Sequence, residues 1–233
     1  MDTLAGKAIP SALEELLSHF KTALLVIDLQ NDFCSEGGIS RKSGHELIRG
    51  AAVINQIKTL INKAREEGLL IIYTLNTNLQ NNLSDSSAWM RHRIRGRNGR
   101  ADIEYTIEGT WGHRLVEEIE PLDGEVVVRK HRASAFVGTN LDLILRSNEI
   151  RTLLVTGILT ESCVDSTARD AEFYDYFAVI LRDCIDSYRR DLHEACLKIM
   201  EARFEVSDSE SIMGLWRGRN LAVENRREKL ETS

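Results

Sequence analysis

The chain has 233 residues, of which 42% are hydrophobic and 28% are charged. This length suits one large α/β domain better than two small ones. The 30 basic and 36 acidic residues give a net charge of −6 with both signs interspersed, which argues against a polyanion-binding protein. No apolar run approaches the roughly 20 residues of a membrane span, and residues 1–20 lack the pattern of a signal peptide. We therefore expect a cytoplasmic protein with neither nucleic acid nor a membrane as its partner.

The cysteines agree with an intracellular location. The chain has 4 of them, too few for a disulfide framework in a protein of this length. They form no CxxC pair, so a structural zinc site is not indicated. The four are Cys34, Cys163, Cys184 and Cys196.

Short apolar runs alternate with longer segments of helical period along the chain. Strands are predicted over 22–27, 69–75, 125–129, 151–157, 177–183 and 204–207. Helices are predicted over 50–67, 110–119, 139–147, 161–175, 190–202 and 208–217. The strand runs are continuously apolar, which indicates burial on both faces and is typical of a parallel sheet. The pattern predicts a three-layer α/β/α domain with a central, mostly parallel six-stranded, Rossmann-like sheet.

No linker or internal repeat divides residues 1–233, so we expect a single domain with its core over about 20–215. Residues 76–109 are polar and show no clear period. A loop of this length inside a compact domain is usually functional. We therefore predict a lid-like loop over 76–109.

Reactive side chains follow several predicted strands. Asp28 follows the first strand, Lys130 the third and Cys163 the fourth. Taken singly, each has an ordinary alternative: a turn acid, a solvated cation or a buried thiol. Ligands of an open parallel sheet bind outside the carboxyl ends of its strands, so we expect these three side chains to meet at one edge.

Cys163 lies where a strand, a tight turn at Gly157 and a helix follow one another, with Thr160 as the expected N-cap. The first turn of a helix has free backbone N–H groups, and its dipole lowers the pKa of a thiol. The sequence therefore predicts an activated thiol at Cys163.

Three motifs, VIDLQNDF (26–33), VVRKHRASAFVGTNLDLIL (127–145) and VTGILTESCVDSTARDA (155–171), resemble those of the isochorismatase-like cysteine hydrolases. Their order and spacing match the family over about 20–215. The resemblance implies a catalytic triad of Asp28, Lys130 and Cys163.

The same resemblance implies backbone features next to the thiol. A non-proline cis peptide is expected between Ile158 and Leu159. The oxyanion hole is expected to consist of the backbone N–H groups of Leu159 and Cys163.

Metal-binding members of the family have histidines just after the second strand. Here no histidine occurs over 69–90, and the 6 histidines of the chain show no ligand spacing. We therefore expect no catalytic metal and no cofactor. Asn76 and the polar loop after it resemble the ureido and carbamoyl branch, in which an asparagine here contacts the substrate. Phe33, with Trp89 and Trp111, is a candidate wall of the substrate pocket.

The segment WMRHRIRGRNGR (89–100) contains five arginines, at positions 91, 93, 95, 97 and 100. Three interpretations remain open: a solvated or interfacial loop, a clamp for a substrate carboxylate, and a nucleic-acid contact. Scarce aromatic residues and the negative net charge disfavour the third. Arg91 is the candidate substrate-binding arginine.

The resemblance implies an amidohydrolase that cleaves a small linear amide, ureido or carbamoyl compound through a thioester and releases ammonia. Relatives commonly form dimers or tetramers, so we expect a homodimer or homotetramer. A vinyl-ether hydrolase of the isochorismatase type is one alternative, and a catalytically silent binding protein of the same fold is another.

Overall fold

In the computed structural model, residues 1–95 and 104–218 are described, with His19 described by its backbone alone. The centre is a six-stranded sheet in the order β5-β4-β3-β6-β7-β8, and every pairing in it is parallel. The strands are β3 (Lys21–Ile27), β4 (Leu70–Asn76), β5 (Val126–Lys130), β6 (Ile150–Ile158), β7 (Phe177–Asp186) and β8 (Glu205–Ser207). The predicted parallel sheet is confirmed.

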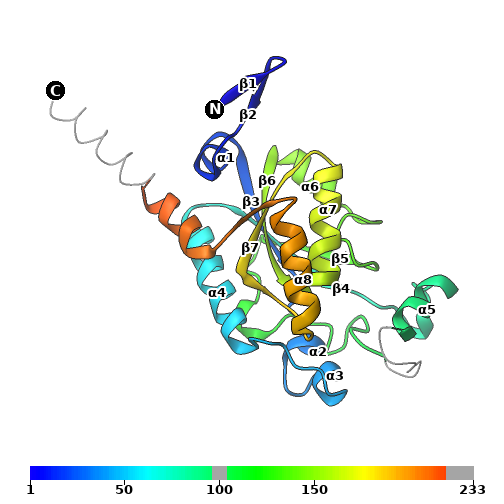
Figure 1. The fold of residues 1–233 in the computed structure, drawn as a ribbon. Helices are drawn as coiled ribbons and strands as arrows, with labels where there is room; N and C mark the ends of the chain where they lie inside the picture. Colours follow the sequence, from blue (N-terminus) through cyan, green and yellow to red (C-terminus); the bar gives the residue numbers. More distant parts are fainter. Residues whose placement is uncertain (96–103, 219–233) are drawn as a thin grey trace.

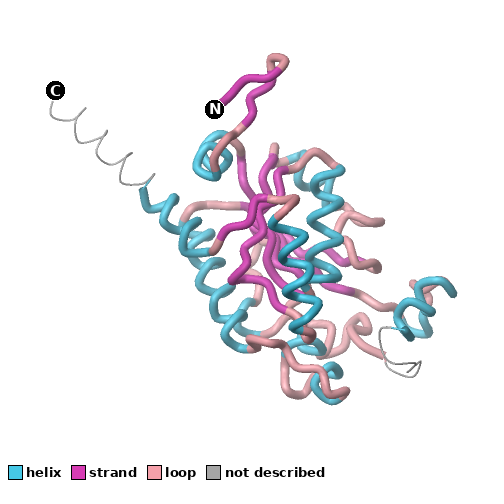
Figure 2. The backbone as a smooth tube through the Cα atoms, viewed as in Figure 1, coloured by secondary structure: helices cyan, strands magenta, loops and turns pink. Residues whose placement is uncertain are grey.

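Helices cover both faces of this sheet, which makes the predicted three layers (Figures 1 and 2). One face is covered by α4 (Ala51–Glu66) and by a helix over 209–218. The opposite face is covered by α6 (Leu141–Ser147), α7 (Asp165–Phe173) and α8 (Arg190–Glu201).

Strand β3 shows why its apolar run is continuous. Leu24 and Val26 belong to the core on the α4 face, whereas Leu25 and Ile27 belong to the core on the α6 face. Successive side chains of a strand point to opposite faces, so both sets have to be apolar when both faces are covered.

The chain enters the sheet at β3, builds outward through β4 and β5, and then returns to the other side of β3 as β6. Strands β3 and β6 are therefore neighbours at the point where the direction of winding reverses. Ligands of open α/β sheets bind at such a point, outside the carboxyl ends of the strands.

The N-terminal residues lie outside the sheet. Strands β1 (Asp2–Leu4) and β2 (Lys7–Ile9) form an exposed antiparallel hairpin, and α1 (Leu13–His19) leads from it into β3. Figure 1 shows the hairpin projecting from the end of the sheet where β3 begins. The prediction of a core beginning near residue 20 did not include this hairpin.

Two short helices follow β3 directly, and the sequence analysis did not predict them. They are α2 (Asn31–Cys34) and α3 (Ile39–Lys42). The predicted helix at 161–175 is also divided in the structure. A π-helical turn, η3 (Thr160–Val164), contains Cys163 and precedes α7.

The polar part of the chain contains helices that the sequence analysis did not predict. The segment 76–109 includes the short helix η1 (Gln80–Asn82) and the α-helix α5 (Ser87–Arg95), and its role as a lid stays a prediction. No residue of α5 is buried, so its sequence has no apolar stripe that would reveal a helix. Figure 1 shows α5 set apart from the sheet.

The predicted helix over 110–119 is reduced to η2 (Glu117–Ile119). The apolar residues before it instead lie along the start of α2. Leu115 forms a β-bridge with Gln30, and the Val116 N–H donates to the Leu29 carbonyl at 3.0 Å. These backbone bonds hold the segment extended and bury the apolar residues that suggested a helix.

Candidate active site

The acid, the cation and the thiol predicted from separate strands lie in contact. Asp28 follows β3, Lys130 ends β5 and Cys163 lies in η3 after β6. The Lys130 Nζ lies 2.6 Å from Asp28 Oδ2 and donates to Cys163 Sγ at 3.3 Å. It also donates to the Arg132 carbonyl at 3.1 Å. The ammonium thus has three partners, one in an ion pair and two in hydrogen bonds.

Asp28 is held by its neighbours on β4. The Thr74 hydroxyl donates to Asp28 Oδ1 at 2.7 Å, and the Asp28 N–H donates to the Thr74 carbonyl. The residue has a positive φ of 54°, a conformation that few non-glycine residues adopt. This backbone turns the chain away from the sheet and leaves the carboxylate between Thr74 and Lys130.

Gly157 lets β6 approach β3 just before the thiol. A Cβ at this position would lie 2.1 Å from the Ile27 carbonyl oxygen, and the φ of Gly157 is 111°. Only glycine tolerates both the contact and this backbone angle. The close approach of the strands brings the turn that carries Cys163 beside Asp28.

The electrostatics of Cys163 correct one expectation. Burial raises the pKa of its thiol to about 12, Lys130 lowers the pKa in part, and Asp28 raises it. The sequence predicted a lowered thiol pKa, whereas burial raises it by more than the Lys130 ammonium lowers it. The predicted N-cap is wrong too, since the Thr160 hydroxyl donates to the Asp186 carbonyl and contacts His193 instead.

Lys130 remains an ammonium in this site. Burial by itself lowers its pKa, but the Asp28 carboxylate and the Cys163 sulfur raise it by more. Both Lys130 and Asp28 are buried, with 0% and 1% of their surface exposed. The site thus holds a neutral thiol beside a charged pair.

The backbone next to the thiol has the expected form. The Ile158–Leu159 peptide bond is cis. The N–H groups of Ser162 and Val164 both donate to the Leu159 carbonyl, at 3.0 and 3.2 Å. The oxyanion-hole role of the Leu159 and Cys163 amides stays a prediction.

Asn76 and Phe33 both contact the segment 105–106. Asn76 is opposite Lys130 in the sheet, and its side-chain amide donates to the Thr106 hydroxyl at 3.0 Å. The ring of Phe33 is 5.7 Å from the ring of Tyr105. The placement of Asn76 at a strand end beside Lys130 is compatible with substrate contact, which stays a prediction.

The arginines of the 89–100 segment differ from one another. Arg91 is exposed on α5, whereas Arg93 forms an ion pair with the buried Asp85. Arg95 is exposed, and the predictions for positions 97 and 100 lie outside the described residues. Arg93 is thus paired with Asp85, and the substrate-binding role of Arg91 stays a prediction.

The sequence analysis missed three residues that hold the site together: Thr74, Gln30 and Arg132. Gln30 bonds the backbone of Asn76 through both ends of its amide and also donates to the His113 carbonyl at 2.7 Å. Thr74 could have been found, because it lies two residues before Asn76 and therefore shares its face of β4. The role of Arg132 depends on its carbonyl, which no sequence pattern reveals.

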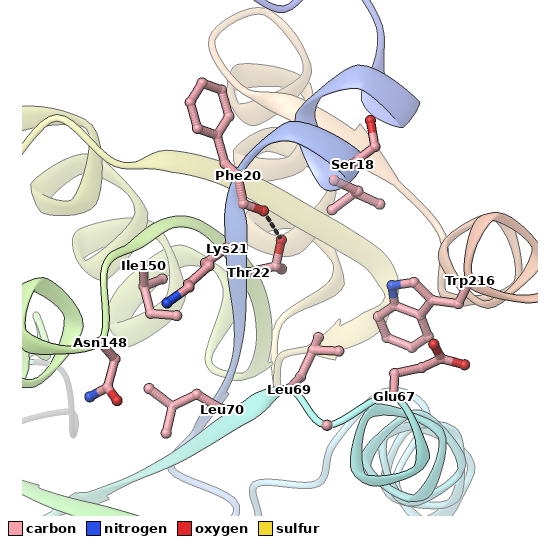
Figure 3. A pocket seen from close by; sticks show the side chains of 12 residues that line it. Ser18, Phe20, Lys21, Thr22, Glu67, Leu69, Leu70, Asn148, Ile150 and Trp216 are labelled. Carbon is pink, nitrogen blue, oxygen red and sulfur yellow. Dashed lines mark hydrogen bonds between the residues drawn. The ribbon is translucent and has the colours of Figure 1, made fainter. Parts of the chain in front are cut away.

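A cavity of about 520 Å³ lies at the amino ends of the strands (Figure 3). Its walls come from the first residues of β3, β4 and β6, and from Trp216, whose ring lies beside Glu67. The thiol is at the carboxyl ends of the strands, so this cavity is not the pocket in which Cys163 would react.

Within 1–95 and 104–218, no group of three or more His, Cys, Asp or Glu side chains is arranged to hold a metal ion. In the same part of the chain, no helix is both long enough and apolar enough to cross a membrane.

A thiol in contact with an ammonium, and beside a carboxylate, is an arrangement suited to nucleophilic attack on a carbonyl carbon. Residues 22–211 match the model of the isochorismatase domain. The chain belongs to the isochorismatase family, which confirms the resemblance of its three motifs.

Known proteins of this family are similar over most of the chain. The ureidoacrylate amidohydrolase RutB of Cronobacter sakazakii is 36% identical over 193 residues, which are 78% of this chain and 81% of that protein. An isochorismatase-like hydrolase from Alkaliphilus metalliredigens has a TM-score of 0.72 at 27% identity, covering 84% of this chain and 99% of that one. N-carbamoylsarcosine amidase from Thermoplasma acidophilum has a TM-score of 0.63 at 26% identity, covering 81% and 96% of the two chains.

Proposed function

We propose that this protein is a cysteine-dependent amidohydrolase that cleaves a small linear amide, ureido or carbamoyl compound and releases ammonia. The protein is a hydrolase that acts on carbon–nitrogen bonds other than peptide bonds. The observation that carries the cysteine mechanism is the position of the Lys130 ammonium, in contact with both Asp28 and Cys163.

The first half of the proposed reaction makes a thioester. Asp28 accepts the proton of the neutral Cys163 thiol while Lys130 stabilises the forming thiolate. The sulfur attacks the substrate carbonyl, and the oxyanion binds the backbone N–H groups of Leu159 and Cys163. The C–N bond then breaks, and protonated Asp28 gives its proton to the departing nitrogen, which leaves as ammonia.

The second half regenerates the thiol. A water molecule gives a proton to Asp28 and attacks the thioester carbonyl, and the carbon–sulfur bond breaks. The acid is released and the proton returns to the sulfur. If the substrate is a ureido compound, R–NH–CO–NH2, the acid released is the carbamate R–NH–COOH, which decomposes to carbon dioxide and the amine R–NH2.

Two observations support a ureido or carbamoyl substrate. The Cronobacter sakazakii relative is a ureidoacrylate amidohydrolase, and the Thermoplasma acidophilum relative is an N-carbamoylsarcosine amidase. Asn76, the candidate substrate ligand, ends the strand next to Lys130. Its amide could bind the ureido group, whose N–H and carbonyl groups match the two ends of an asparagine. Phe33 and Arg91 are the other proposed substrate contacts.

The test is a release assay for ammonia with ureidoacrylate, biuret, N-carbamoyl amino acids and nicotinamide. We expect turnover of a ureido or carbamoyl compound, unchanged after exhaustive chelation because the proposed steps use no metal. Activity that chelation removes and added zinc or iron restores would contradict this mechanism. Hydrolysis of isochorismate alone would favour the vinyl-ether alternative, and no turnover at all would favour a silent binding protein. A cytoplasmic homodimer or homotetramer stays the predicted form of the enzyme.

A further inference from the structure

Arg132 contacts both Lys130 and the segment that leads into α5. Its carbonyl accepts a hydrogen bond from Lys130 Nζ at 3.1 Å. Its Nη1 donates to the Ser84 carbonyl at 3.1 Å, and its guanidinium carbon lies 5.1 Å from the centre of the Trp89 ring. One residue therefore joins the buried ammonium to the segment containing α5.

The carbonyl of Arg132 is the only uncharged oxygen among the three partners given above for the ammonium. The other two, Asp28 and Cys163, exchange a proton in the proposed reaction, whereas a backbone carbonyl does not titrate. Losing this bond would leave a buried N–H of a charged group without an acceptor, which is unfavourable. The Arg132 carbonyl therefore fixes how the ammonium is oriented toward the sulfur.

The segment before α5 is held against the end of β5 at further points. The Thr77 N–H donates to the Lys130 carbonyl at 2.8 Å, and the Thr77 carbonyl contacts His131 Nδ1 at 2.7 Å. In α5 itself, the Trp89 ring stacks on His92 at 4.9 Å and also lies against Arg132. Since α5 buries none of its residues, its placement depends on contacts such as these.

We propose that Arg132 is a positioning residue, which couples the placement of the α5 segment to the orientation of the Lys130 ammonium and hence to the reactivity of Cys163. Turnover as a readout rests on the proposed function. Alkylation of the thiol does not, so the two proposals can fail separately.

Two charged groups shift the pKa of the Cys163 thiol. Lys130 from β5 lowers the pKa of Cys163, and Asp28 from β3 raises it. Burial raises the pKa of Cys34 in α2, and the carboxylates of Asp186 and Asp28 raise it further. Arg132 would act on Cys163 through Lys130, the group among these that lowers the thiol pKa.

The experiment measures the rate at which iodoacetamide labels Cys163 in the full chain between pH 7 and pH 10, followed by peptide mapping. In this range the rate follows the thiolate fraction. For Arg132→Ala we expect labelling about tenfold slower at every pH, equivalent to a thiol pKa about one unit higher. Arg132→Lys can still donate to the Ser84 carbonyl and lie over Trp89, so it should restore most of the rate.

Arg129→Ala is the matched control. Arg129 precedes Lys130 on the same strand, but it is exposed and pairs with Glu108 on the surface. Its removal should leave the labelling rate unchanged. If Arg132→Ala labels as fast as Arg129→Ala, or faster because the site has merely opened, the proposal is overturned.

Trp89→Ala is a second variant, which keeps Arg132 but removes the ring beneath it. We expect slower labelling, and the effects of Trp89→Ala and Arg132→Ala should not add when combined. Fully additive effects would overturn the proposed coupling. An unchanged labelling rate in Trp89→Ala would overturn it too. The Trp89→Ala result is decisive if Arg132→Ala does not fold. Where a substrate is turned over, kcat should fall more than KM rises.

Discussion

The Lys130 ammonium and the Asp28 carboxylate form an ion pair of 2.6 Å, with almost no exposed surface on either side chain. The desolvation of two such charges is offset only when their remaining hydrogen-bonding groups also have partners. Here the Thr74 hydroxyl donates to the other carboxylate oxygen. The ammonium donates to the Arg132 carbonyl and to the Cys163 sulfur. The charges that drive the proposed chemistry are therefore also a condition for folding.

Breaking this pair should cost stability as well as activity. Asp28→Asn and Lys130→Met should each lower the free energy of unfolding by about 3–5 kcal/mol, because a buried charge loses its partner. The double variant should regain most of that stability in urea denaturation while remaining inactive. Losses that simply add in the double variant would show that the two groups do not act as a pair.

Cys163→Ala should abolish ammonia release and leave the fold intact. Cys163→Ser should be nearly as inactive, because a hydroxyl is far harder to ionise than a thiol. Replacing Cys184, which is fully buried, by alanine provides a control that alters packing and not the site. Intact-mass and peptide analysis of the enzyme during turnover checks the assignment, and an acyl adduct on another cysteine would refute it.

The raised pKa of Cys163 predicts a pH dependence of stability. The thiol keeps its proton in the folded protein until about pH 12, whereas in the unfolded chain it is lost near its ordinary value of 9.0. Its contribution to stability is complete below the lower value and is lost as the pH rises through the upper one. The wild-type protein should therefore lose more stability than Cys163→Ala between pH 8 and pH 10.5 in denaturant titrations. Parallel curves for the two proteins would mean that the folded thiol has an ordinary pKa.

Gly157→Ala should prevent β6 from lying against β3. The added Cβ would lie 2.1 Å from a backbone oxygen that cannot move without breaking the sheet. We expect a loss of about 3 kcal/mol or more in the free energy of unfolding, or no folded protein. Gly214→Ala is the control, since its Cβ has only a flexible arginine tip within 4 Å, at 3.8 Å, and alanine favours the helix. Equal stability of the two variants would argue against the role of Gly157.

Arg91→Ala tests the carboxylate clamp. With a substrate that carries a carboxylate, such as ureidoacrylate, KM should rise about tenfold while kcat stays nearly constant, since binding is lost equally in ground and transition states. Biuret, which has no carboxylate, serves as the control substrate and should be unaffected. The same KM for both substrates in the variant and the wild type would leave Arg91 as a surface residue.

The buried parts of this protein could be predicted from its sequence. Each strand of the sheet was located within three residues, because a strand covered on both faces is a continuous apolar run. Asp28, Lys130 and Cys163 could be placed together, because parallel strands bring their carboxyl ends to one edge.

What could not be predicted depends on surroundings that lie far away in the sequence. Helix α5 has no apolar stripe, so its pattern resembled that of a loop. The pattern around Leu115 and Val116 predicted a helix, but residues 29–30, just before α2, hold them extended. The position of Cys163 at a helix start predicts a lowered thiol pKa. Burial of the sulfur raises the pKa instead, and burial depends on the packing of the whole fold.

The order of strands in the sheet also determines the order in which the site is made during synthesis. The ribosome completes β3, β4 and β5 before β6 begins, and these three are consecutive neighbours in the sheet. Asp28 and Lys130 can therefore pair on the nascent chain while one edge of β3 is still open. The nucleophile arrives only when β6 docks on that edge, so the reactive thiol is the last member of the site to enter. An N-terminal fragment would carry the charges without the sulfur, and the exposed β3 edge would make it prone to aggregation.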